Sequence, residues 1–168
     1  FNIQHPTKGR MVYQAFEYQT KLLDIYHNYR FNINMLPRQT GKSTTAAGYL
    51  LWYAMFVPDS VILIAAHKYA GAQEIMQRIR YAYELCPNHI RAGVTSYNKG
   101  SIDFDNGSRI VAQATTDNTG RGMSITLLYC DEFAFVQPNI AEEFWTSISP
   151  TLATGGRAII TSTPNSDE

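Results

Sequence analysis

The order of apolar and polar positions predicts strands that alternate with helices along most of the chain. Short unbroken apolar runs are typical of strands covered on both faces. These predicted strands are residues 31–36, 61–66, 125–130 and 157–161. Longer segments with apolar residues at helical spacing lie between them. These predicted helices are residues 12–29, 42–56, 69–85 and 140–148. The alternation indicates a three-layer α/β domain with a mainly parallel central sheet.

One part of the chain departs from this alternation. Segments 101–105 and 108–112 flank the dipeptide Asn106-Gly107. Asn-Gly between alternating segments is the strongest short hairpin signal, so an antiparallel pair is predicted here. The sequence contains no repeat and no low-complexity tract.

Composition narrows the classes of protein that fit. The chain of 168 residues suits one domain with a real core. Its 14 basic and 14 acidic residues balance, whereas a domain that grips nucleic acid over a broad face is usually basic. Any DNA contact is therefore expected to be local or to lie elsewhere. The first residue is Phe1 and the last follows an apolar run closely, so we expect a fragment of a longer protein.

The cysteines, histidines and apolar runs of the sequence do not point to a disulfide, a metal site or a membrane span. Cys86 and Cys130 lie far apart and are expected to be reduced core thiols of an intracellular protein. The four histidines are scattered, and no metal-like spacing links them. The longest apolar run, 49–57, is too short to span a bilayer and is expected to be a buried helix.

A loop typical of phosphate binding lies between the strand at 31–36 and the helix at 42–56. Gly41-Lys42-Ser43 matches the end of the usual template, but Leu36 occupies the place of its first glycine and Arg38 lies within the loop. Backbone amides at the positive end of the helix can surround a β-phosphate. Lys42 would reach the β and γ oxygens, and Ser43 would bind Mg²⁺. The alternative is an ordinary strand–helix turn. The predicted nucleotide-binding residues of this loop are Arg38, Gln39, Thr40, Gly41, Lys42, Ser43 and Thr44.

Two carboxylates follow the strand at 125–130, at the sheet edge where α/β proteins bind ligands. Asp131 would hold Mg²⁺ through a water, and Glu132 would orient and deprotonate an attacking water. Alone, an Asp-Glu pair after a strand is more often a solvated turn or a helix cap. The loop upstream makes the catalytic interpretation the preferred one.

Gln19 lies 23 residues before Lys42, and its amide can pair with an adenine edge. A nearby aromatic, Tyr13, Phe16 or Tyr18, could stack on the ring. The alternative is a polar residue on the outer face of an amphipathic helix.

Two arginines and a hydroxyl cluster complete the candidate residues. Arg38 is expected to point near the triphosphate or to pair with a carboxylate. Arg121 lies between two glycines, eleven residues before Glu132, where a guanidinium could reach a γ-phosphate, its own or that of a neighbouring subunit. A structural ion pair is the alternative for Arg121. Hydroxyls that could sense the γ-phosphate, or that merely end a strand, are Thr161, Ser162 and Thr163.

Together these segments resemble the ATPase domain of the large terminase subunit, the DNA-packaging motor of tailed bacteriophages. The family carries an upstream glutamine, a phosphate loop with an internal arginine, an Arg-Gly step, Asp-Glu followed by a small residue, and a Thr/Ser run before Pro-Asn. In this chain the corresponding segments are Gln19, Pro37–Ser43, Arg121-Gly122, Asp131–Phe135 and Thr161–Asn165. The likeness covers residues 13–165, and the order and spacing of five motifs make it specific.

The resemblance implies a P-loop NTPase of the additional-strand, catalytic-glutamate type. It implies that residues 1–168 are an N-terminal ATPase domain that uses ATP and Mg²⁺ to move double-stranded DNA into a prohead. Implied partners are the portal protein, the small terminase subunit and further copies in a ring, in the cytoplasm of the infected bacterial host, with no membrane and no structural place in the virion. The family's linking subdomain and C-terminal nuclease would lie beyond Glu168.

Other classes fit less well. Helicase-like and restriction-type translocases usually carry an acidic residue or histidine two places after Asp-Glu, where this chain has Ala134. A nucleotide-binding scaffold without turnover would not need Glu132. A small-molecule kinase would show a lid or an acceptor signature, and none is evident.

Overall fold

A computed structural model of the chain describes residues 2–5, 9–12, 31–35, 42–87, 93–133, 136–152 and 155–162. The predicted phosphate loop at 37–41 lies outside the described residues, as do Leu36 and most of the predicted helix at 12–29. Val12, expected to begin that helix, instead ends a strand. A short antiparallel hairpin of β1 (Asn2–His5) and β2 (Gly9–Val12) forms there. The prediction of helix at Val12 is therefore wrong.

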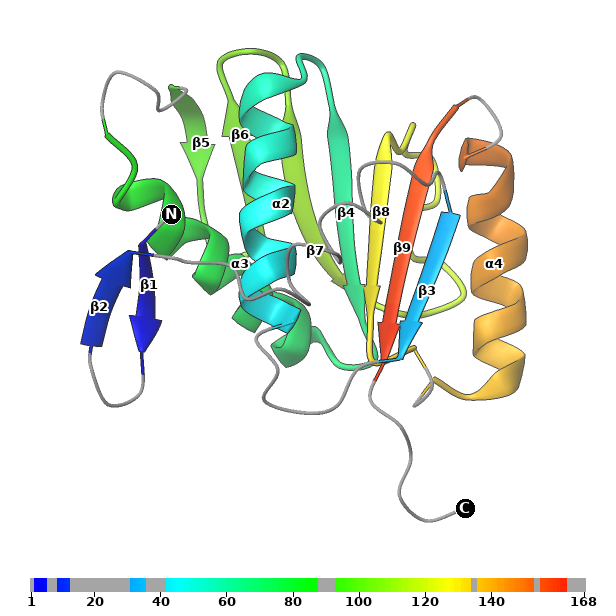
Figure 1. The fold of residues 1–168 in the computed structure, drawn as a ribbon. Helices are drawn as coiled ribbons and strands as arrows, with labels where there is room; N and C mark the ends of the chain where they lie inside the picture. The colour runs from blue at the N-terminus through cyan, green and yellow to red at the C-terminus, as the bar shows by residue number, and fades with distance from the viewer. Residues whose placement is uncertain are drawn as a thin grey trace.

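A seven-stranded sheet forms the centre of the molecule (Figure 1). Its first five strands run parallel, the sixth is antiparallel to the fifth, and the seventh is antiparallel to the sixth. In spatial order the strands are β3 (Phe31–Met35), β9 (Arg157–Ser162), β8 (Leu127–Asp131), β4 (Val61–Ala66), β7 (Arg109–Ala114), β6 (Ser101–Phe104) and β5 (Val94–Tyr97). The predicted hairpin at Asn106-Gly107 is the β6–β7 pair. The mainly parallel sheet is confirmed.

Helices cover both faces of this sheet. Helices α2 (Lys42–Phe56) and α3 (Tyr69–Glu84) lie on one face, and α4 (Pro138–Leu152) lies on the other (Figure 1). Because side chains alternate along a strand, β4 serves both layers. Ile62 and Ile64 pack with α2 and α3, while Leu63 packs with α4. The predicted three-layer α/β architecture is confirmed.

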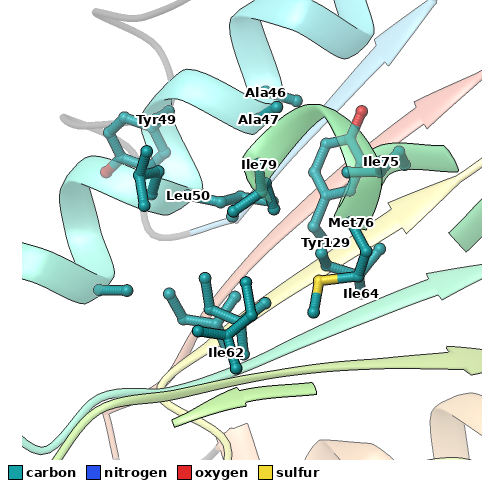
Figure 2. Packing of buried hydrophobic residues seen from close by; sticks show 14 of the residues in the cluster. Ala46, Ala47, Tyr49, Leu50, Ile62, Ile64, Ile75, Met76, Ile79 and Tyr129 are labelled. Carbon is teal, nitrogen blue, oxygen red and sulfur yellow. The ribbon is translucent and has the colours of Figure 1, made fainter. Parts of the chain in front are cut away.

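The core on the α2 face places the residues of the site. Small residues Ala46 and Ala47 let α2 approach the sheet closely, and both are almost fully buried. Tyr129 of β8 lies in the same cluster, near Ile75 and Met76 of α3 (Figure 2). None of the helices that the structure describes is long and apolar enough to cross a membrane.

The predicted ends of helices and strands differ from the observed ends mainly where strand pairing or helix capping sets the end. The helix at 42–56 and the strand at 61–66 agree with the prediction to the residue. Strand β8 begins at Leu127, two residues later than predicted, because Thr126 forms hydrogen bonds with Val61 at the start of β4. Helix α4 extends further than 140–148 and begins at Pro138, a residue favoured at the first helical position. Strand β5 was not predicted at all.

Candidate functional site

The carboxyl ends of four parallel strands bring the predicted site residues to one edge of the sheet. Asp131, the last residue of β8, pairs with Thr161 of β9 on one side and Ala66 of β4 on the other. Ser162 pairs with Met35, the last residue of β3. The predicted carboxylate and hydroxyl residues, 30 positions apart in sequence, are thus neighbours across a strand pair. This is the ligand-binding edge of an open α/β sheet.

Buried hydrogen bonds join three side chains at this edge. The Thr161 hydroxyl donates to Asp131 Oδ1 over 3.0 Å. The hydroxyls of Tyr129 and Thr161 are also 3.0 Å apart. Asp131 is 9% exposed, whereas Tyr129 and Thr161 are 0% exposed. The carboxylate is therefore held at the surface of the core by partners that water does not reach.

Helix α2 begins on the same side of the sheet as these side chains. Tyr129 packs in the cluster that contains Ala46 and Ala47 from the second turn of α2. Asp131 lies two residues after Tyr129 on the same strand, so its side chain points to the same face. Lys42 is the first residue of α2, and Ser43 in the first turn is partly exposed. The positive end of α2, which has no acidic residue in its first turn, is oriented for an anion.

Glu132 follows β8 in an unusual backbone conformation. Its φ is 54°, in the left-handed region that few non-glycine residues occupy. The next residue, Phe133, packs on the α4 side, with ring centroids 5.9 Å from Phe144 and 6.4 Å from Trp145. Such conformations persist where the surroundings impose them, and they concentrate at functional sites. The second predicted carboxylate therefore leaves the sheet at a defined but strained position.

Arg121 lies on the opposite side of the sheet from Asp131. The loop that carries it begins at the carboxyl edge of the sheet, where Thr115 N–H donates to Ala66 O. The loop ends at the amino edge of the sheet, where Thr126 N–H donates to Val61 O. Between these points Gly120 packs against Leu63 and α4. The Arg121 side chain is exposed.

Sequence reasoning missed two residues at the site. Arg78 of α3 donates from Nη1 to Thr44 Oγ1 in the first turn of α2 over 3.2 Å, and Nη2 pairs with Glu74 at 3.4 Å. The partners Arg78 and Thr44 are 34 positions apart, so only the packing of α3 on α2 brings them together. The second missed residue is Tyr129, whose signal was a polar-tipped side chain inside an otherwise apolar buried strand.

Several predicted residues lie outside the described part of the chain, namely Gln19, Arg38, Gln39, Thr40, Gly41 and Thr163. Within the described ranges, no three His, Cys, Asp or Glu side chains are grouped as a metal site. A hydroxyl and one carboxylate, with water, form a common Mg²⁺ ligand set. Cys86 and Cys130 form no disulfide, and burial raises the pKa of the Cys130 thiol, with Asp131 adding to the shift.

Comparisons with known proteins agree with this geometry. Residues 33–168 match the family model described as "Terminase large subunit, T4likevirus-type, N-terminal". The large terminase ATPase domain of Thermus phage P74-26 superposes with a TM-score of 0.69 at 21% identity, covering 91% of this chain and 66% of that one. The HK97 bacteriophage large terminase gives 0.72 at 20% identity, with 96% and 35% covered.

A third structure carries a nucleotide. The large terminase of a thermophilic bacteriophage, in complex with ADP, gives a TM-score of 0.69 at 12% identity, covering 88% of this chain and 39% of that one. The chain therefore spans about two-thirds of the P74-26 ATPase domain and well under half of the other two large terminases.

Proposed function

The chain belongs to the T4-like-virus-type family of terminase large subunits, of which it matches the N-terminal part, and on that premise we propose that it is the ATP-hydrolysing motor domain that drives double-stranded DNA into a prohead. The observation that carries the proposal is the meeting of Asp131 and Thr161 at the carboxyl edge of the sheet, on the face where α2 begins. This arrangement fits a nucleoside triphosphate with a divalent cation.

We assign a proposed role to each residue of the site. The amides at the start of α2 and Lys42 would bind the β- and γ-phosphates, and Gln19 and residues 38–41 would complete the nucleotide site. Asp131, through water, and Ser43 would hold Mg²⁺, which neutralises phosphate charge when bound. Glu132 would orient the attacking water and accept its proton. The ADP complex of the thermophilic bacteriophage large terminase supports nucleotide binding by this fold.

Arg121 is proposed to act on the nucleotide of a neighbouring copy. Its loop packs on the α4 face, whereas Asp131 and the start of α2 lie on the α2 face. The loop that carries this exposed side chain thus packs on the opposite face of the sheet from the Asp131 carboxylate. Arg38, inside the phosphate loop, would serve the nucleotide of its own subunit. A guanidinium delivered in trans can raise the rate of phosphoryl transfer by about 10³–10⁵-fold.

The wider assembly follows from the family. We propose a ring of copies that contacts the portal protein and the small terminase subunit in the cytoplasm of the bacterial host. The linking subdomain and the metal-dependent nuclease of the large subunit would belong to further parts of the protein. The balanced charge of this chain is consistent with DNA contacts that are local or lie in those parts.

Two variants that should be inactive test the general-base role of Glu132 and show whether Arg121 acts on the nucleotide of its own subunit or of a neighbouring one. In the full-length large subunit on proheads, Glu132→Gln should bind ATP normally but not turn it over, and Arg121→Ala should do the same. Lys42→Ala is the contrasting variant, because it should weaken nucleotide binding itself. Steady-state hydrolysis by Glu132→Gln would refute the general-base role.

Mixing the two variants gives the decisive measurement. A mixed ring contains interfaces between a Glu132→Gln subunit and an Arg121→Ala subunit. If Arg121 acts in trans, the Glu132→Gln subunit supplies Arg121 at such an interface, and the Arg121→Ala subunit supplies an intact Glu132. ATP hydrolysis should then reappear on mixing and peak near equal proportions. If mixed rings stay inactive at every ratio while wild-type subunits restore activity, Arg121 acts within its own subunit.

A further inference from the structure

The hydrogen bonds at the end of β8 have a direction that can be assigned by counting protons. A threonine hydroxyl has one hydrogen, and in Thr161 it is directed to Asp131 Oδ1, an acceptor-only atom when the carboxylate is ionised. In the contact between Tyr129 and Thr161, the tyrosine must therefore be the donor. The sequence of bonds runs from the Tyr129 O–H to Thr161 Oγ1, and from the Thr161 O–H to Asp131 Oδ1.

The Tyr129 hydroxyl lies in an apolar part of the core, where a side chain without a hydroxyl would be favoured. Tyr129 is 0% exposed and lies among Ile64, Ile75 and Met76 (Figure 2). Burying a hydroxyl in apolar surroundings is unfavourable unless it is hydrogen-bonded, and phenylalanine would fill nearly the same volume without that penalty. The Thr161 hydroxyl, equally buried, is a hydrogen-bond partner for it.

We propose that Tyr129 is a positioning residue for the metal-holding carboxylate, acting through Thr161. The bond from Tyr129 holds the Thr161 hydroxyl in one rotamer, and the bond from Thr161 holds the plane of the Asp131 carboxylate. This inference rests on the proposed function, because that function assigns the binding of Mg²⁺ to Asp131. It also changes the role expected for Thr161, whose proton is directed to Asp131 rather than to the γ-phosphate. The Thr161 hydroxyl thus responds to nucleotide through the carboxylate.

The expected effect concerns the magnesium requirement. Tyr129→Phe removes one oxygen and leaves the packing in place, so the protein should fold. The Mg²⁺ concentration that gives half-maximal ATP hydrolysis should rise about three- to tenfold, the effect of one lost hydrogen bond. The rate at saturating Mg²⁺ should change less. A purely structural role would lower thermal stability without moving the magnesium requirement.

Two further variants and one control show whether Tyr129 acts through Thr161. Thr161→Ser keeps the hydroxyl and should retain the wild-type requirement, whereas Thr161→Val removes both bonds and should raise it at least as far as Tyr129→Phe. In the Thr161→Val background, Tyr129→Phe should add nothing, because residues in one network are not additive. Tyr81→Phe is the matched control, since Tyr81 is a partly exposed tyrosine of α3 whose hydroxyl makes no hydrogen bond among the described residues.

The measurements are the Mg²⁺ dependence of hydrolysis and of binding of a fluorescent ATP analogue, made on the full-length large subunit. A wild-type magnesium requirement in Tyr129→Phe, or an undiminished effect of Tyr129→Phe in the Thr161→Val background, would overturn the inference. Failure of the proposed function is a different result, in which the wild-type protein neither binds the analogue nor hydrolyses ATP at any Mg²⁺ concentration.

Discussion

The two glycines beside Arg121 form a natural matched pair, and the structure predicts that only one of them tolerates alanine well. Both have left-handed backbones, with φ of 72° at Gly120 and 79° at Gly122. Each alanine therefore carries the same conformational penalty of about 1 kcal/mol. Each also gains the same benefit of about 0.5–1 kcal/mol from a less flexible unfolded chain. These terms cancel when the two variants are compared.

The difference between them is steric. A Cβ at Gly120 would lie 2.9 Å from Ile148 Cδ1, 3.0 Å from Leu63 Cδ2 and 3.1 Å from Ile125 Cδ1, whereas a Cβ at Gly122 would meet nothing within 4 Å. The ordinary separation of carbon atoms is about 3.5–4.0 Å. Because Leu63 and Ile148 are fully buried, their methyl groups cannot move without disturbing neighbours. Overpacking of this kind costs about 1–3 kcal/mol.

Urea unfolding followed by circular dichroism measures this difference. Gly120→Ala should have a free energy of unfolding about 1–3 kcal/mol lower than Gly122→Ala, which itself should stay within about 1 kcal/mol of wild type. For a domain of this size, 1 kcal/mol corresponds to about 2–4 °C in Tm. Equal midpoints with equal slopes would show that the contacts around Gly120 yield freely, and that the Arg121 loop is not fixed against α4 as described.

Two further predictions concern the end of α2 and the cysteines. Asn106→Ala should lower the free energy of unfolding by about 2 kcal/mol in urea titrations, because Asn106 Nδ2 donates to Ala54 O and Met55 O at the end of α2. Asn98→Ala, which removes bonds at an exposed turn, is the control and should cost less than about 1 kcal/mol; equal losses would contradict the capping role. In the folded chain at pH 8, a thiol-specific chromogenic reagent should titrate Cys86 only, since burial raises the pKa of the Cys130 thiol. Release of two equivalents at the same rate before unfolding would show that Cys130 is accessible.

The parallel core of the fold could be predicted because its periodicity is local. The apolar run Val61–Ala66 and the helix-forming segment Lys42–Phe56 can each be recognised from neighbouring residues alone, and both predictions agree with the structure to the residue. Strand β5 could not be found in this way. Its four residues are mostly exposed and it pairs only at the edge of the sheet, so no apolar pattern marks it. The apolar spacing around Val12 is compatible with a helix and with a strand, and it predicts a helix. The pairing of Val12 with Asn2 makes it a strand residue instead.

The site could be predicted as residue types but not as a network. Asp131 and Glu132 were found because a buried strand ended in two carboxylates, and Thr161 because it closed another such strand. Which hydroxyl bonds which carboxylate depends on the register of β8 against β9, which pairs Asp131 with Thr161. A shift of one residue would have turned Thr161 to the α4 face. The role of Tyr129 follows from this register and is invisible in the sequence alone.

The same register explains why Glu132 can occupy a left-handed backbone. Immediately before it, Asp131 is tied to Thr161 on the α2 face by a buried hydrogen bond. Immediately after it, the ring of Phe133 packs against Phe144 and Trp145 on the α4 side. The backbone of Glu132 must connect two anchors that lie on different sides of the sheet, and a φ of 54° is the conformation that results. The penalty is about 1 kcal/mol, and the partly buried ring of Phe133 helps to offset it through its contacts with the core on the α4 side. The Phe133 contacts and the Thr161–Asp131 bond thus act from opposite sides to fix the direction in which Glu132 leaves the sheet, as the proposed role of Glu132 in orienting water requires.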